Sequence, residues 1–475
     1  MKFLKHIVIF SVVFLNLQLT YADHLVVKGR HGLSSSGDDF AARYEQTNKI
    51  VTANGKTHFA WLEADLDVKY RTYDHSLQSW ETITKLGRAQ DNHGGPALAI
   101  DPVGKLHTFF GPHGGLFEYF KSSTSWESSD WEGQASFGEV ATYPSVAIDR
   151  NNTIHIAYRG KLDTESHKDS VPLKLIYQYK KEGQPWSQPQ LVASPCLENT
   201  DELYKPVDEY AHYHHSLTIS ENGELHLLYD IYFKSKLMYV GPRARWIGYL
   251  KKSILDDNGT WNYSNEWKTL SGNAHPLPIS PASPGDAFVK VVSTSSDLAL
   301  TVSGVALDSR GRPWFTLREE TFKAETCYED PVTGYLTPDE CDVTHRDYIL
   351  YHHNGTSWEH WDLFQLLPSG LNNPKISNIL PISIDANDNL YIAGVINSSV
   401  MVLYKNIHSP APLFNTLVVA PEMVDRQYNH VNIERPTNQN KIGMPWLLFS
   451  FDSPLEGGGE DDRGPDNVEA AQLGY

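Results

Sequence analysis

Amphipathic helix patterns are nearly absent from this 475-residue sequence. Few stretches repeat apolar residues at a spacing of three and four, whereas runs of alternating polar and apolar residues, bounded by Gly, Asn and Asp, recur throughout. The sequence therefore favours an all-β protein.

Cysteine is also scarce, and positive charge is outweighed by negative charge. Three cysteines (Cys196, Cys327 and Cys341) are too few for a disulfide scaffold, and their odd number leaves one to explain. With 58 acidic and 40 basic residues, the formal net charge is −18. This acidity argues against nucleic acid and anionic membranes as partners. An anionic substrate would need a local basic site.

Long apolar runs are missing except at the start of the chain. Residues 1–22 place Lys2 and Lys5 before an apolar run that ends in small residues, which predicts a secretory signal peptide cleaved after Ala22. We expect a secreted protein, extracellular or periplasmic, without membrane insertion.

What the sequence does contain is a repeat. Each copy reads as a strand, a turn rich in Asp, Asn and Gly, and a second strand, and most copies are followed by another strand pair. The seven copies begin near residues 48, 96, 144, 215, 303, 381 and 432. This pattern predicts one seven-bladed β-propeller domain over residues 23–452, with the strand at 24–29 closing the last blade. We expect a monomer whose acidic, Gly-rich tail, residues 453–475, is partly disordered or wrapped on the surface.

Propeller topology gathers polar residues on one face. His93 precedes the first strand of the second copy and His113 follows its second strand, so both lie on the same face near the central channel. The same rule adds residues from later copies, namely Tyr158, His212, Tyr213, Tyr229, Arg243 and Arg245. The opposite face carries turns such as "DPVG" and "DRNN".

Each of these residues also has an ordinary structural interpretation. A histidine beside glycines is commonly a loop residue bonded to backbone. Tyr158 and Tyr229 share their repeat position with Trp61 and Phe110, which is typical of aromatic packing inside the blades. Arg245 could pair with a surface carboxylate.

A set of His, Tyr and Arg without a carboxylate pair suits β-elimination from a uronic acid. Glycoside hydrolysis normally uses two flanking carboxylates, and these loops offer no obvious pair. Elimination needs a cation to neutralise the sugar carboxylate, a base of moderate pKa, and an acid for the leaving oxygen. Arg, neutral His and Tyr fit these three roles.

The stretches "HGGPALAID…GKLH…FGPH" and "YPSVAID…IHIAYR" resemble the secreted seven-bladed propeller lyases that depolymerise ulvan, an anionic algal polysaccharide. The resemblance implies that His93, His113 and Tyr158 form the catalytic centre. We expect one of the two histidines, with His93 preferred over His113, to be the base, Tyr158 to be the proton donor, and the other histidine to contact the substrate carboxylate. The family's neutralising Arg corresponds to Lys174 here, so either Lys174 or Arg245 takes that role. Further substrate contacts are expected from His212, Tyr213 and Tyr229. The products would carry unsaturated uronate ends.

The segment 327–345 is an insertion on the same predicted face. Cys327 and Cys341 could form a disulfide, as a secreted protein permits. Alternatively, Cys327, Cys341 and His345 bind Zn²⁺ with Cys196 or a histidine of the "HYHH" segment as fourth ligand. The family resemblance implies a structural metal, with zinc expected and calcium as second candidate.

Two other functions remain open. The "IDxxGxLH" turns are faintly similar to the aspartate-box turns of sialidases, so a sialidase-like propeller hydrolase is one alternative. A non-catalytic carbohydrate-binding propeller is the other. An ultraviolet assay on uronate polymers separates elimination from both alternatives, because only elimination creates a conjugated double bond.

Overall fold

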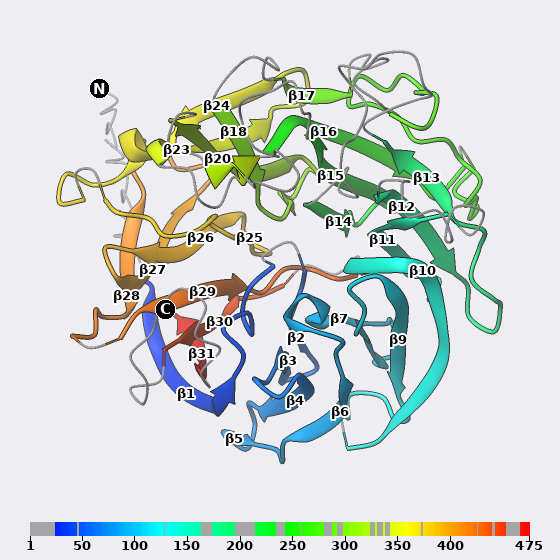
Figure 1. The fold of residues 1–475 in the computed structure, drawn as a ribbon, viewed down its shortest axis with the longest axis horizontal. Coiled ribbons are helices and arrows are strands. Elements are labelled where there is room, and N and C mark those ends of the chain that lie inside the picture. Colours follow the sequence, from blue (N-terminus) through cyan, green and yellow to red (C-terminus); the bar gives the residue numbers. More distant parts are fainter. Residues whose placement is uncertain are drawn as a thin grey trace, which may run out of the picture.

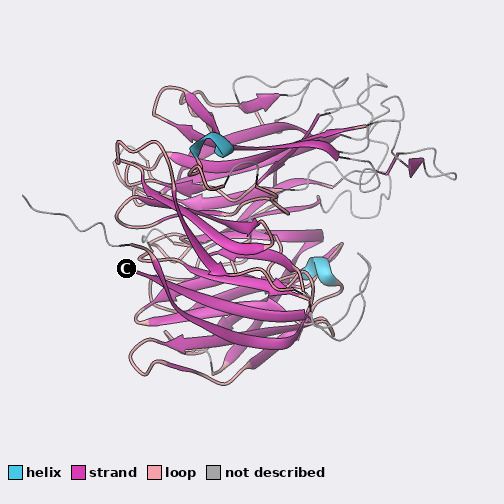
Figure 2. Cartoon of the chain, turned by 90° about the vertical axis from the view of Figure 1, so that its left-hand side faces the viewer, coloured by secondary structure: helices cyan, strands magenta, loops and turns pink. Residues whose placement is uncertain are grey.

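In the computed structural model the strands are arranged as sheets in a ring around a central axis (Figure 1), and Figure 2 shows this ring from the side. The residues described are 24–44, 47–127, 129–162, 173–194, 214–233, 243–256, 258–279, 287–291, 298–323, 328–329, 336–337, 343–371, 374–424, 426–438, 442–452 and 466–475. Helical structure in these ranges includes two short 3-10 turns, η1 (Asn92–Gly94) and η5 (Leu363–Leu366). None of the described helices is long and apolar enough to cross a membrane.

The first half of the ring contains two sheets. The first holds β2 (Ile50–Ala53), β3 (Lys56–Leu62), β4 (Asp67–Asp74), β5 (Ser79–Trp80) and β6 (Thr84–Arg88). The second is seven-stranded and holds β7 (Ala97–Ile100), β8 (Leu106–Phe110), β9 (Gly115–Ser122), β10 (Trp131–Ile148), β11 (Ile154–Lys161), β12 (Lys174–Lys180) and β13 (Gln190–Ala193).

The second half contains three further sheets of four or more strands. The nine-stranded sheet holds β14 (His215–Ile219), β15 (Glu224–Phe233), β16 (Arg243–Ser253), β17 (Phe288–Val291), β18 (Leu298–Val302), β19 (Ala306–Leu307), β20 (Pro313–Phe322), β23 (Val343–His353) and β24 (Trp358–Asp362). The next holds β25 (Ile382–Ile384), β26 (Asn389–Ile396), β27 (Ser399–Asn406) and β28 (Asn415–Ala420). The last holds β29 (Tyr428–Ile433), β30 (Trp446–Phe451), β31 (Asp466–Gly474) and β1 (Val26–Gly37). A two-stranded hairpin, β21 (Tyr328–Glu329) and β22 (Leu336–Thr337), stands apart.

The prediction of an all-β propeller is confirmed, but the sheets are not seven separate blades. The described residues form five sheets of four or more strands. The seven-stranded and the nine-stranded sheets are larger than one blade because strands link neighbouring copies of the repeat. β10 pairs with β9 through its first part and with β11 through its second part, and β16 contacts β18 through the pair Ala244 and Leu300.

The chain ends meet in the last sheet, as the closure prediction requires, but the tail behaves differently from the prediction. β1 pairs antiparallel with β31, from Val26 opposite Gly474 to Gly37 opposite Asp466. Residues 466–474 are thus a strand between β30 and β1, and do not wrap on the surface. Closing the ring this way removes exposed sheet edges.

Aspartate turns explain the repeated "IDxxGxLH" pattern. Asp101 Oδ1 accepts hydrogen bonds from the backbone N–H groups of Val103 and Lys105, and Asp101 Oδ2 lies 3.2 Å from His107 Nε2. His107 Nδ1 lies 2.8 Å from the hydroxyl of Tyr119 on the next strand. The repeated histidines are therefore structural groups inside the blades.

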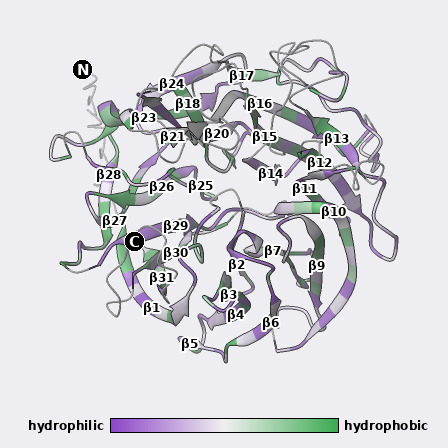
Figure 3. Cartoon of the chain, in the orientation of Figure 1, coloured by the Kyte–Doolittle hydropathy of each residue, from purple (hydrophilic) through white to green (hydrophobic). Residues whose placement is uncertain are grey.

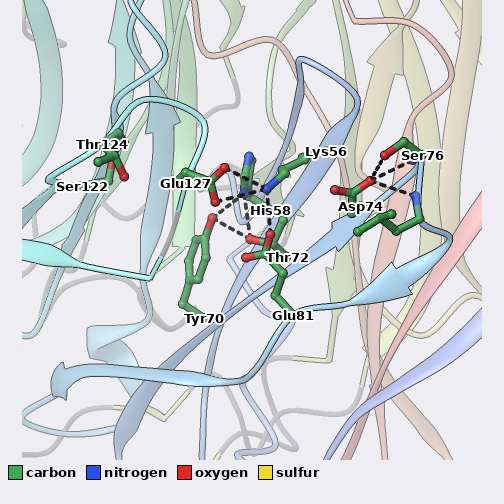
Figure 4. A network of polar contacts seen from close by, with 11 residues as sticks. Lys56, His58, Tyr70, Thr72, Asp74, Ser76, Glu81, Ser122, Thr124 and Glu127 are labelled. Carbon is green, nitrogen blue, oxygen red and sulfur yellow. Dashed lines mark hydrogen bonds and ion pairs between the residues drawn. The ribbon is translucent and has the colours of Figure 1, made fainter.

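The same arrangement recurs in other copies. Asp149, His155 and Tyr177 repeat it, with 3.2 Å from His155 Nε2 to Asp149 Oδ2 and 2.8 Å from His155 Nδ1 to the tyrosine hydroxyl. In the first copy His58 Nδ1 lies 2.5 Å from the hydroxyl of Tyr70 (Figure 4). Burial lowers the pKa of His58 to about 3, so this histidine is neutral inside the blade.

Apolar side chains fill the spaces between neighbouring sheets, because strands alternate their side chains between two faces. Polar and apolar residues alternate along long strands such as β10 (Figure 3). One core cluster joins β11 and β12 to β14, β15 and β16 through residues such as Leu175, Leu217 and Leu227.

The segment after β29 crosses the centre of the ring. Arg435 Nη1 donates a 2.7 Å hydrogen bond to Ser216 Oγ on β14, and Asn48 Nδ2 donates to the Arg435 carbonyl at 3.1 Å. Thr437 O accepts from Ile148 N at 2.7 Å. The last repeat is thus bonded at the axis to β14, to β10 and to Asn48, just before β2.

Candidate functional site

His93 and His113 come together as the repeat predicted. His93 lies in η1, just before β7, and His113 lies between β8 and β9. Their rings are stacked, with centroids 4.1 Å apart and planes at 16°. The side chains are 29% and 23% exposed, so both are partly accessible to a ligand.

Glycines allow this approach. Gln90 N donates to Gly111 O at 2.7 Å, and Gly111 N donates to Gly94 O at 3.1 Å, which holds the η1 loop against the end of β8. A Cβ at Gly94 would lie 2.7 Å from the Gly111 carbonyl oxygen, closer than side chains tolerate. A larger residue at this position would therefore separate the two histidines.

Asp91 ties the two histidines together. Its Oδ1 accepts a 2.8 Å hydrogen bond from the backbone N–H of His93, and its Oδ2 lies 2.7 Å from His113 Nδ1. His93 Nδ1 lies 3.4 Å from Asp91 Oδ1. Asp91 was not among the predicted site residues, although an aspartate directly before a short helical turn is a recognisable cap.

Burial tunes this cluster electrostatically. Burial, followed by the neighbouring His113, lowers the pKa of His93 to about 4, although the Asp91 carboxylate opposes the shift. Burial also acts to raise the pKa of Asp91, but hydrogen bonds from His93 N and His113 outweigh it and the pKa falls below its usual value. At neutral pH His93 is a neutral base beside a carboxylate.

Aromatic rings and two arginines surround His93. The ring centroids of Phe40, Tyr44 and Tyr143 lie 5.9, 6.3 and 6.3 Å from that of His93. The guanidinium of Arg159 lies 4.5 Å from the centre of the Tyr143 ring, and that of Arg43 lies 4.0 Å from the centre of the Phe40 ring. Both positive charges contribute to the low pKa of His93. Neither arginine was predicted.

Tyr44 and Tyr143 carry backbone strain. Their φ angles are 65° and 54°, in the left-handed region that residues other than glycine rarely adopt. Their rings face each other at 4.7 Å. Each such residue costs about 1–3 kcal/mol and persists only where its surroundings hold it, which is common at functional sites.

Tyr158 points into a blade. It is 1% exposed, and its hydroxyl donates a 2.6 Å hydrogen bond to Gln178 Oε1. Its ring packs against Phe117 at 5.5 Å. Because neighbouring residues of a strand face opposite sides, Arg159 is the residue of this pair directed toward Tyr143. The ring contacts of His93 within the described residues do not include Tyr158.

The remaining predicted substrate contacts are dispersed. Tyr229 is fully buried in a blade core, and burial raises the pKa of its hydroxyl. Lys174 is the first residue of β12 and pairs with Gly160. Arg245 belongs to β16, and nothing is described of its side chain. His212 and Tyr213 lie outside the described residues.

Three of the predicted zinc ligands, Cys196, Cys327 and Cys341, also lie outside the described residues. His345 is described, and its Nε2 lies 2.8 Å from Asp347 Oδ1. A different set of donors could hold a metal ion, since one ligand atom each from Asp91, His93 and His113 lie within 4.8 Å of one another. Two imidazoles and a carboxylate suit zinc chemically.

The sequence matches one family model and, over a shorter stretch, two ulvan lyases. Residues 56–365 match the model of the BNR repeat-containing family. An ulvan lyase of Nonlabens ulvanivorans is 29% identical over 135 residues, which are 23% of this chain and 29% of the relative. An ulvan lyase of Alteromonas sp. (strain LOR) is 27% identical over 134 residues, 23% of this chain and 28% of the relative. The match thus spans less than a third of either relative.

Solved structures share the fold over nearly the whole chain. A PL25 ulvan lyase bound to -[GlcA(1-4)Rha3S]- superposes with a TM-score of 0.66 at 13% identity, covering 93% of this chain and 95% of that one. The polysaccharide lyase Uly1 gives 0.59 at 11% identity, covering 94% and 99%. At these identities the likeness concerns the fold. The family match covers well over half of the sequence, and the chain therefore belongs to the BNR repeat-containing family.

Proposed function

We propose that this protein is a polysaccharide lyase that cleaves ulvan by β-elimination. The observation that carries the proposal is the stacked pair His93 and His113 held by Asp91, with arginines and aromatic rings beside it. The partial matches to two ulvan lyases and the shared fold support it. The substrate is an anionic algal polysaccharide, and the products carry unsaturated uronate ends.

In the proposed mechanism His93 removes the proton next to the uronate carboxylate. A positive group neutralises that carboxylate and makes the proton acidic. The electrons of the broken C–H bond form the C=C bond as the glycosidic C–O bond breaks, and an acid protonates the leaving oxygen. His113 with Lys174 or Arg245 is the predicted neutralising set, and Arg43 is a further candidate because it lies beside the aromatic group around His93.

Tyr158 remains the predicted proton donor. In that role its hydroxyl would exchange the bond to Gln178 for one to the leaving oxygen. Tyr44 and Tyr143 are the alternative donors, because their rings lie next to His93.

The test is ultraviolet detection of unsaturated product from ulvan. His93→Asn keeps one hydrogen bond but removes the base, so turnover should fall about a hundredfold or more. His275→Asn, a change at an exposed histidine bonded to the Pro276 carbonyl, is the matched control and should retain activity. Reducing ends without unsaturated product would instead support the sialidase-like hydrolase, and binding without any cleavage would support a carbohydrate-binding propeller.

We further propose that the two largest sheets each contain two blades, which gives seven blades in total. Each of these sheets contains two copies of the repeat, and strand links join the copies. A crystal structure in which the blades number five would overturn this proposal.

Secretion through a signal peptide at residues 1–22, a monomeric state and a structural metal remain proposals. Elemental analysis should find one zinc per chain bound by Cys327, Cys341 and His345 with Cys196 or a histidine, and calcium is the second candidate. A metal-free protein whose mass is lower by two hydrogen atoms would instead establish a disulfide between Cys327 and Cys341.

A further inference from the structure

A cavity of about 460 Å³ lies between the sheet of β20, β23 and β24 and the sheet of β26 and β27. Its lining includes the turn Asp308–Arg312 between β19 and β20. His113 lies in a connection between second and third strands, whereas this turn joins first and second strands. Because successive connections of a meander alternate between the two ends of the strands, the cavity lies on the face opposite His93 and His113.

Parallel aromatic rings form one wall of this cavity. Trp314 and His352 stack with ring centroids 3.9 Å apart and planes at 15°. Trp361 lies nearly parallel to Trp314, at 6.2 Å and 14°. All three residues line the cavity, so an aromatic wall faces any bound molecule. Pockets with aromatic walls and a few polar groups are typical ligand sites.

Two positive charges on the same lining have no partner among the residues that the structure describes. Neither Arg310 nor Arg312 has a side-chain hydrogen bond or ion pair anywhere in the described ranges. The nearby carboxylate of Asp308 is engaged, since its Oδ1 accepts the backbone N–H groups of both arginines at 2.9 Å. On a chain with a net charge of −18, two unpaired guanidinium groups beside aromatic rings form a local anion site.

A second cavity of about 190 Å³ extends this site toward the axis. It shares Asp308 and Arg310 with the first cavity, and its lining also includes Ser220 and Pro436. Pro436 belongs to the segment that crosses the centre of the ring. The two cavities together would accommodate a ligand longer than one sugar ring.

We propose that this pair of cavities binds an acidic saccharide without cleaving it. The sulfate or carboxylate of the sugar contacts Arg310 and Arg312, and its ring lies against Trp314 and Trp361. Guanidinium groups bind such anions through paired N–H donors. The site does not depend on lyase activity, and in an enzyme acting on an acidic polymer it would hold a second stretch of the chain on the opposite face.

Calorimetric titration of the full chain carrying His93→Asn tests the proposal, because this variant prevents turnover. The ligands are glucuronate, glucose 6-sulfate and glucose. We expect the two acidic sugars to bind and glucose to bind at least tenfold more weakly, and the stronger of the acidic sugars identifies carboxylate or sulfate as the recognised group. Adding Arg310→Gln and Arg312→Gln should weaken the acidic sugars at least tenfold or remove one binding event.

Arg150→Gln is the matched control, since Arg150 occupies the corresponding turn of the third repeat. Equal binding by this control and by the double variant would overturn the proposal, as would equal affinity for glucose. If the double variant fails to fold, the exposed Arg310→Gln alone gives the same comparison. Because binding is measured without turnover, failure of the native chain to cleave ulvan would leave this result unaffected.

Discussion

At the scale of single residues, the candidate site contains a histidine that stays neutral next to charged neighbours. His93 is partly buried, adjoins His113 and Asp91, and has a pKa of about 4. An unperturbed histidine titrates near about 6.5. The difference favours the neutral, proton-accepting form over a wide pH range.

The first prediction concerns the pH dependence of activity. The base is active when neutral, so the acid limb of kcat/KM should follow the pKa of free His93, at about 4. Activity then persists through mildly acidic pH and declines below it. Asp91→Asn removes the charge that raises the pKa of His93 and weakens the hold on His113, so the limb should move lower. The loss of a hydrogen bond to a charged group should lower kcat about 10–100-fold. The position of the acid limb and the value of kcat are measured from pH–rate profiles of the native protein and the variant on ulvan. An acid limb near about 6.5 in the native protein would contradict the proposed environment of His93.

The second prediction separates the proton donors. If Tyr158 is the donor, Tyr158→Phe lowers turnover about a hundredfold or more. Loss of its buried hydrogen bond to Gln178 should also destabilise the fold by about 1 kcal/mol. Tyr143→Phe is the comparison variant, because Tyr143 lies beside His93. Turnover and urea unfolding should be measured for both, and an inactive Tyr143→Phe beside an active Tyr158→Phe would transfer the donor role to Tyr143.

At the scale of elements, the turn between the first two strands of the second and third copies is a hydrogen-bonded unit. An aspartate closes the turn and contacts a buried histidine, which contacts a tyrosine on the third strand. Three strands of one blade are thereby tied together. This explains why the histidines of "GKLH" and "TIHI" are buried and do not belong to the site.

The third prediction tests this unit. Asp101→Ala removes the acceptor of two backbone N–H groups and a partner of buried His107, so stability should fall by about 2–4 kcal/mol. Asp74→Ala is the control, because Asp74 also caps a turn but is partly exposed, whereas Asp101 is buried. The free energy of unfolding in urea provides the measurement. Equal losses of unfolding free energy in the two variants would show that burying the aspartate–histidine–tyrosine unit adds no stability.

At the scale of the whole molecule, the ring closes through its two chain ends. β31 pairs with β1 on one side and with β30 on the other. Burial of Val468, Ala470 and Leu473 attaches this strand to the core. The last residues of the chain are thus part of the fold.

The fourth prediction follows from closure. Deleting residues 466–475 removes a strand, exposes two sheet edges and should prevent cooperative folding or promote aggregation. Glu469→Gln is the control within the same strand, because it removes only the partly exposed ion pair with Arg30. Such pairs contribute about 0–1 kcal/mol, so the melting temperature should change little. A deletion variant that melts like the native chain would show that β31 is dispensable.

The sequence by itself determined the all-β propeller, the closure by residues 24–29 and the meeting of His93 with His113. Alternation, turn residues and repeat spacing are local properties, and topology converts them into a shared face. Only the tertiary structure decided that Asp91, Arg43, Arg159 and two strained tyrosines lie around the two histidines, that β31 joins the last sheet, and that Tyr158 faces Gln178. These outcomes depend on which side of a strand a residue occupies and on contacts between distant segments, and a one-residue difference in strand position reverses the direction of a side chain.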